Sequence, residues 1–91
     1  MSASETVEIS NQRGLHARAS AKFVNHVAAL PEGLRVEVEK DGHRVSGTSI
    51  MGLMMLGAAR GDTITIHVEG GGADAALLKL TGLVRDRFGE D

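Results

Sequence analysis

The stretch that decides the fold is residues 34–46, which read Leu34-Arg35-Val36-Glu37-Val38-Glu39-Lys40-Asp41-Gly42-His43-Arg44-Val45-Ser46. Apolar and polar side chains alternate through residues 34–40, which is the pattern of a strand with one buried face. Asp41-Gly42 is a strong two-residue turn signal, because both residue types tolerate a positive φ. The stretch therefore predicts an antiparallel hairpin whose second strand is residues 43–46.

Two further segments alternate in the same way. Thr6–Ser10 predicts a first strand, and Thr63–Glu69 predicts a last one with Ile64, Ile66 and Val68 facing inward. Three segments have helical spacing instead: about Ala17 to Ala29, ended by Pro31-Glu32-Gly33; a short helix over Ile50–Leu56; and a longer helix that begins at Asp74 and ends at Gly89, with Leu77, Leu80, Val84 and Phe88 along one face. Each strand has one apolar face, so we expect an α+β fold with a sheet covered by helices on one side.

Length and composition limit the functions that are open to the chain. With 91 residues it is long enough for one core, and we expect a single domain over residues 1–91. The net charge of -2 and the aromatic content of 2% argue against nucleic acid as a partner. We expect no membrane insertion and no secretory leader, and the absence of cysteine agrees with a reducing compartment, so the expected location is the cytoplasm.

The spacing of the four histidines does not favour a metal site. His16 and His26 are ten residues apart on one predicted helix, or about 15 Å along its axis, which is too far for shared coordination. His67 points outward from its strand and His43 adjoins the hairpin turn. We expect His26, His43 and His67 to be solvated, and we expect no metal or cofactor.

His16 differs because of its neighbours, in the stretch Gly14-Leu15-His16-Ala17-Arg18. The first-turn N–H groups of Ala17 and Arg18 lack acceptors within the helix and are available to an anion. A neutral imidazole is nucleophilic and can attack an activated phosphoryl group. From spacing alone two interpretations stay open: a phosphoryl-accepting His16 assisted by Arg18, or a histidine that only caps the helix beside a solvated arginine.

The wider sequence resembles the HPr family of phosphocarriers of the phosphoenolpyruvate-dependent phosphotransferase system. Three motifs carry the resemblance: Gly14-Leu15-His16-Ala17-Arg18, Ser49-Ile50-Met51-Gly52-Leu53-Met54 and Gly61-Asp62-Thr63-Ile64-Thr65-Ile66. The resemblance implies an open-faced β-sandwich, in which three helices cover a four-stranded antiparallel sheet. It also implies that His16 accepts a phosphoryl group on Nδ1 from phosphorylated enzyme I and passes it to a IIA-type protein. Such a chain is a covalent relay and not a multiple-turnover enzyme.

The family resemblance extends to a second site and contains one departure. Ser49 matches the serine that an HPr kinase/phosphorylase modifies in some members, although a plain N-cap explains a serine there equally well. Ala19 stands where many members carry proline after the arginine, which removes some rigidity from the first turn and no chemistry. Ala19 and the methionines together favour assignment of the chain to the nitrogen-related branch of the family.

The short predicted helix carries more apolar surface than it can bury. Ile50, Met51 and Met54 are therefore candidates for an exposed docking surface beside His16, adaptable enough for several partners. Two other functions stay open: a regulatory binding module that acts through the Ile50–Met54 face without obligatory phosphorylation of His16, and a small structural domain whose histidines are incidental.

Overall fold

A computed structural model of the chain describes residues 1–90, and its elements follow the predicted order. The strands are β1 (Ser2–Glu8), β2 (Arg35–Lys40), β3 (His43–Ser46) and β4 (Thr63–Glu69). The helices are α1 (Ala17–Ala28), α2 (Ile50–Met55) and α3 (Ala73–Arg85), and a short 3-10 turn, η1 (Arg87–Gly89), follows α3. Among residues 1–90, no helix is long and apolar enough to cross a bilayer.

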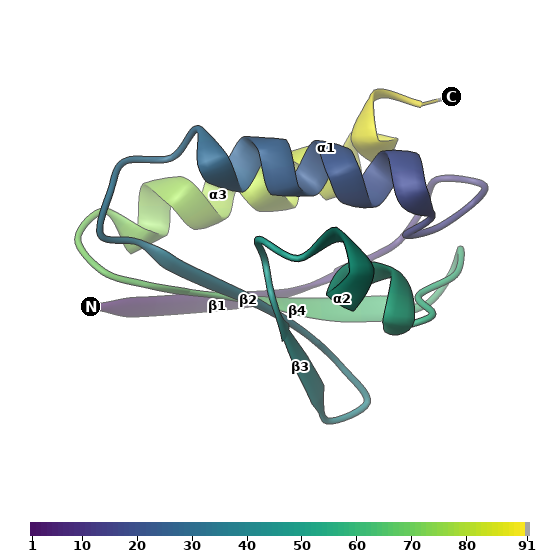
Figure 1. The fold of residues 1–91 in the computed structure, drawn as a ribbon, viewed down its shortest axis with the longest axis horizontal. Coiled ribbons are helices and arrows are strands. Elements are labelled where there is room, and N and C mark those ends of the chain that lie inside the picture. Colours follow the sequence, from purple (N-terminus) through teal and green to yellow (C-terminus); the bar gives the residue numbers. More distant parts are fainter. Residues whose placement is uncertain (91) are drawn as a thin grey trace.

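The four strands form one antiparallel sheet in the order β1-β4-β2-β3. Val36 pairs with Val68 and Val38 with Ile66, so the apolar residues of neighbouring strands share one face. Figure 1 shows α1, α2 and α3 on that face, with α1 and α3 running side by side above the sheet. The predicted open-faced α+β sandwich is confirmed.

The core lies between the sheet and the helices. The predicted inward set Ile64, Ile66 and Val68 is at most 1% exposed. The helices contribute further fully buried side chains, and the largest are Phe23 of α1, Leu53 of α2, Leu80 of α3 and Phe88 of η1. Burying side chains of this size on both layers is what holds α1 against the sheet and sets the position of its first turn.

Two predicted element bounds are wrong. β1 covers residues 2–8 and not 6–10, because residues 2–5 pair with residues 66–69 of β4 although their side chains give no clear apolar alternation. The last helix ends at Arg85 and not at Gly89, because Arg87 and Phe88 adopt positive φ values of 56° and 55° that break the helix. Phe88 is therefore not part of the helical stripe, although it is fully buried.

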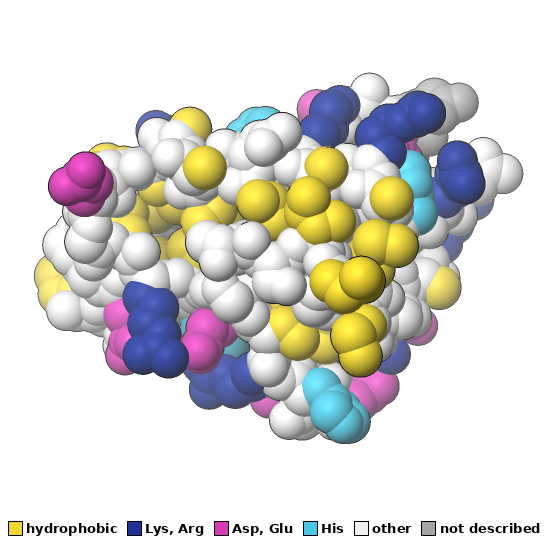
Figure 2. Space-filling view, viewed as in Figure 1, with side chains coloured by type: hydrophobic (Ala, Val, Ile, Leu, Met, Phe, Trp, Pro, Cys, Tyr) yellow, Lys and Arg dark blue, Asp and Glu magenta, His cyan; other side chains and the backbone are white. Residues whose placement is uncertain are grey.

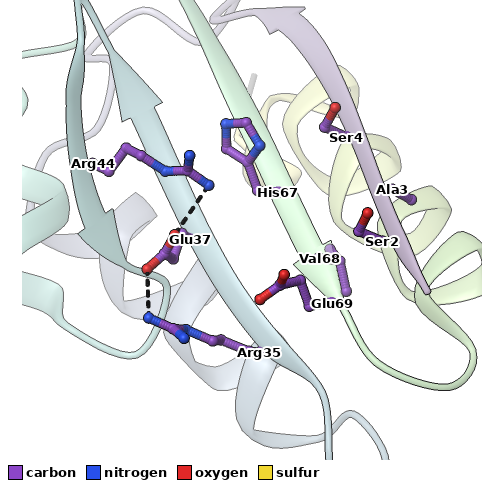
Figure 3. A pocket seen from close by; sticks show the side chains of 9 residues that line it. All are labelled: Ser2, Ala3, Ser4, Arg35, Glu37, Arg44, His67, Val68 and Glu69. Atoms are coloured by element: carbon purple, nitrogen blue, oxygen red, sulfur yellow. Dashed lines mark hydrogen bonds and ion pairs between the residues drawn. The ribbon is translucent and has the colours of Figure 1, made fainter.

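The face of the sheet away from the helices is polar. Arg35 and Arg44 both bind the Glu37 carboxylate, at 3.1 and 3.0 Å, and His67 lies beside them on β4 (Figure 3). His67 points outward from β4 as expected, but its side chain is 25% exposed and its Nε2 is 2.8 Å from Glu39 Oε1, so it is paired and less solvated than expected. This pairing arises because β2 and β4 are neighbours, which their sequence separation hides. His26 and His43 are exposed as expected.

Candidate functional site

The loop before α1 is anchored by one close backbone contact. Gly14 has a φ of +66°, and a Cβ there would lie 2.3 Å from the Ala58 carbonyl oxygen. The next residue, Leu15, donates its N–H to that same oxygen at 2.9 Å and buries its side chain in the core. Leu15 and Ala19 are both buried in the core, on either side of His16 in the sequence. They therefore hold His16 at the start of α1.

His16 occupies the N-cap position of α1, but its ring makes no capping hydrogen bond. The side chain is 16% exposed, and Nε2 lies 2.9 Å from Glu90 Oε2. No hydrogen bond joins Nδ1 to any of the residues 1–90. Ser20 donates the first i→i−4 bond of the helix, to the His16 carbonyl at 2.9 Å, so the amides of Ala17 and Arg18 precede the helical ladder as predicted.

Cationic side chains surround the ring. A hollow of about 280 Å³ adjoins His16, and it is lined by Gln12, Arg13, His16, Arg18, Lys22, Gly89 and Glu90. Arg18 is exposed, and it forms no ion pair with an acidic side chain in the described part of the chain. Lys22 donates to the Phe88 carbonyl at 2.6 Å, which ties α1 to η1. The site is therefore a shallow, mostly positive surface around one imidazole.

Glu90 is the exception in this positive surface, and the sequence analysis missed it. Its Oε1 accepts a hydrogen bond from Asn11 Nδ2 at 3.2 Å, while its Oε2 meets His16. Asn11 is fully buried, and its Nδ2 also donates to the Gly14 carbonyl at 2.8 Å. Partial burial raises the pKa of Glu90, but the hydrogen bonds from His16 and Asn11 and the positive charge of His16 and Arg18 outweigh it, so the pKa lies below its usual value.

Of the site residues that the sequence did not indicate, Glu90 and Asn11 carry no local signal, whereas Arg13 and Lys22 do. Glu90 lies 74 residues from His16 along the chain, and nothing in the spacing near the C-terminus indicates that it returns to the first helix. Arg13 and Lys22 flank the histidine motif closely enough to have been included on charge alone. The buried Asn11 is indistinguishable in sequence from an ordinary turn residue.

Ser49 and the short helix α2 form the second candidate site. Ser49 is the N-cap of α2, and its Oγ accepts from the Gly52 N–H at 2.9 Å. The side chains of Ile50, Met51 and Met54 are 41%, 68% and 40% exposed, and Met55 adds a fourth at 79%. Figure 2 shows hydrophobic side chains gathered over α2, next to histidine and cationic side chains on the α1 side. We call Ile50, Met51, Met54 and Met55 the α2 patch; its docking role stays a prediction, as does modification of Ser49.

Known proteins resemble this chain over nearly its whole length. Residues 3–86 match the family model for the PTS HPr component phosphorylation site. The phosphocarrier protein HPr of Neisseria meningitidis is 44% identical over 86 residues, which are 94% of each chain. The phosphocarrier protein NPr of Shewanella violacea is 37% identical over 84 residues, which are 92% of this chain and 90% of that protein. The crystal structure of HPr-C-His from Thermoanaerobacter tengcongensis has a TM-score of 0.89 at 37% identity and covers 98% of both chains.

Relatives that are named HPr and NPr both appear, so the lean toward the nitrogen-related branch stays a prediction. The family itself is shown by the extent of the match and by its agreement with the fold. The chain belongs to the HPr family of phosphocarriers of the phosphotransferase system.

Proposed function

We propose that the protein accepts a phosphoryl group on His16 Nδ1 from phosphorylated enzyme I and passes it to a IIA-type protein. The observation that carries the proposal is the His16 ring itself, because it is partly exposed at a helix N-terminus and, among residues 1–90, forms a hydrogen bond through Nε2 and none through Nδ1. A histidine that served only to cap the helix would direct a ring nitrogen at the first-turn amides, and this ring does not.

In the proposed step, the Nδ1 lone pair attacks the phosphorus of a phosphohistidine on enzyme I. The new Nδ1–P bond forms as the donor's N–P bond breaks. In a second step of the same kind, a nitrogen of the acceptor histidine attacks the phosphorus, and the Nδ1–P bond breaks as the group leaves His16. The amides of Ala17 and Arg18 and the Arg18 guanidinium lie where charge on the migrating group needs neutralising. Helix-end contacts contribute roughly 0.3–1 kcal/mol each, which orients a phosphoryl group without retaining it.

The α2 patch is the docking surface in this proposal. It presents flexible apolar side chains next to the site, and such a surface adapts to several differently shaped partners. The same patch would serve the alternative function of a regulatory binding module, in which docking persists without phosphorylation of His16. Presence or absence of an acid-labile phosphate therefore decides between the two functions.

Phosphorylation of Ser49 by an HPr kinase/phosphorylase belongs to the same proposal. A phosphate at a helix N-terminus is compatible with the fold, because free amides and the helix dipole favour negative charge there. The same charge would stand at the base of the α2 patch and repel a partner shaped for an apolar surface.

We assign the relay to the cytoplasm. A chain without cysteine forms no disulfide bonds, so it does not need an oxidising compartment to fold.

The proposed function is tested by phosphoryl transfer from phosphoenolpyruvate through purified enzyme I. Wild type is expected to acquire one acid-labile phosphate and to lose it when a IIA-type protein is added. His16→Ala is expected to remain unlabelled. His26→Ala, at an exposed histidine of the same helix, is the matched control and should label like wild type. Unlabelled wild type, or equal labelling of His16→Ala, would refute the relay.

A further inference from the structure

We propose that Glu90 is the positioning residue of His16: its carboxylate holds the ring proton on Nε2 and so leaves the lone pair on Nδ1. The inference rests on the proposed phosphoryl relay, because it specifies which nitrogen attacks. It adds Glu90, which follows η1, to a site whose other charged or titratable side chains come from residues 13–22.

Hydrogen-bond chemistry fixes the direction of the contact. An ionised carboxylate can only accept, so the 2.9 Å contact between Glu90 Oε2 and His16 Nε2 requires a proton on Nε2. In a neutral imidazole the other nitrogen then carries the lone pair. Both side chains are only partly exposed, at 16% and 15%, so their positions are restricted by the surrounding residues although solvent still reaches the contact.

Several contacts hold the Glu90 carboxylate in place. Asn11 is fully buried and donates to Oε1, so both carboxylate oxygens are engaged. On the backbone side, the buried Phe88 anchors the turn, and Lys22 binds its carbonyl oxygen. Arg87 and Phe88 are both in the left-handed region, which non-glycine residues adopt only where surrounding contacts impose it. The turn is therefore a specified structure that delivers Glu90 to the ring.

The carboxylate also acts on the charge that develops during transfer. When Nδ1 attacks phosphorus, the ring gains positive charge, and the Nε2 proton stays on the ring. Glu90 lies against that proton, whereas the incoming phosphoryl group is on the opposite side of the imidazole. Because Coulomb energies fall with distance, attraction between carboxylate and ring exceeds repulsion between carboxylate and phosphoryl group. The arrangement is the same in principle as a carboxylate that orients the histidine of a hydrolytic triad.

The first test reads the ring directly, without any partner protein. Nitrogen chemical shifts of ¹⁵N-labelled His16, measured at about pH 8.5 where imidazoles are neutral, report which nitrogen is protonated. Wild type is expected to show the Nε2–H form almost alone. Glu90→Ala is expected to show a mixture of the Nε2–H and Nδ1–H forms. Asp86→Ala is the matched control, because it removes an exposed carboxylate four residues before Glu90, and it should match wild type. Equal tautomer populations in wild type and Glu90→Ala would overturn the inference.

The second test measures the rate of labelling by phosphorylated enzyme I in a single turnover. Glu90→Ala is expected to be slower than wild type by about two- to tenfold, the range for loss of one hydrogen bond, and Asp86→Ala should be unchanged. An unchanged or faster Glu90→Ala would overturn the inference, and a faster one would identify Glu90 as an inhibitory charge. The relay stands or falls separately, since it depends on labelling of wild type at His16 and not on this ratio.

Discussion

At the scale of single residues, Gly14 determines where the histidine stands. Its positive φ turns the chain into α1, and the Ala58–Ala59 backbone packs against it so closely that any side chain would collide. The same contact places the Leu15 amide on the Ala58 carbonyl, one residue before His16. The position of His16 therefore depends on a glycine that takes no part in the chemistry.

Gly14→Ala should lower the free energy of unfolding by about 2–6 kcal/mol. The left-handed backbone costs about 1–3 kcal/mol for a non-glycine residue, and overpacking against Ala58 adds a comparable amount. Gly33→Ala is the matched control, because Gly33 also has a positive φ, +89°, but a Cβ added there would have no atom within 4 Å. Urea unfolding of both variants measures the difference, and equal destabilisation would show that the close approach contributes nothing.

At the scale of secondary-structure elements, α2 is a helix of six residues that buries only Leu53. Its capping serine and its packing against α1 and β3 keep it in place, and the other apolar side chains face solvent. Exposing four large apolar side chains on so short a helix gives no stability to the free protein. Their arrangement beside α1 is explained if a partner covers them.

Met51→Lys should weaken docking of phosphorylated enzyme I and of the IIA-type acceptor while the fold stays intact. We expect the KM for transfer to rise about tenfold, as for loss of about 1.4 kcal/mol at an interface. Leu78→Lys is the matched control, because Leu78 on α3 is 70% exposed and Met51 is 68% exposed. If both variants transfer like wild type, or if Leu78→Lys is impaired as strongly, the α2 patch is not the docking surface.

Elements whose residues follow a regular pattern could be predicted from the sequence, and those fixed by distant contacts could not. The hairpin and β4 alternate clearly, and α1 has an uninterrupted apolar stripe, so all three lie where expected. The first half of β1 has no clear apolar alternation, and it forms a strand because it pairs with the edge of β4. The turn at Phe88 continues the spacing of α3, and only its left-handed backbone separates it from the helix.

The candidate site divides in the same way. His16, Ala17 and Arg18 lie in one short motif, and the helix start places them together as predicted. Glu90 reaches the ring, and Asn11 reaches Glu90, only because Phe88 is buried and residues 87–90 fold back against α1. Neither residue type nor spacing carries that information, since the contact is a product of the completed core.

At the scale of the whole molecule, the loop after the first strand and the last turn meet over the start of α1. Glu90 contacts Asn11 and His16, and the Lys22 ammonium binds the Phe88 carbonyl. Residues 88–90 thus close one side of the site. The Glu90 carboxylate helps to hold this segment against Asn11 and His16. The strength of that link should depend on pH.

Glu90→Gln should be less stable than wild type near neutral pH, and the difference should disappear in acid. The pKa of Glu90 is lower in the folded protein than its ordinary value of 4.5, so above that value the folded state gains from the ionised carboxylate. As the pH falls through the lowered pKa, the folded protein takes up the proton and this gain is lost. The difference in unfolding free energy should be below about 1 kcal/mol at pH 7, because solvent screens a pair at the surface. Urea unfolding of both proteins from pH 7 to pH 3 measures it, and other acidic groups cancel because both proteins share them. A difference that stays constant through this range would mean that the Glu90 carboxylate gains nothing from its contacts with His16 and Asn11.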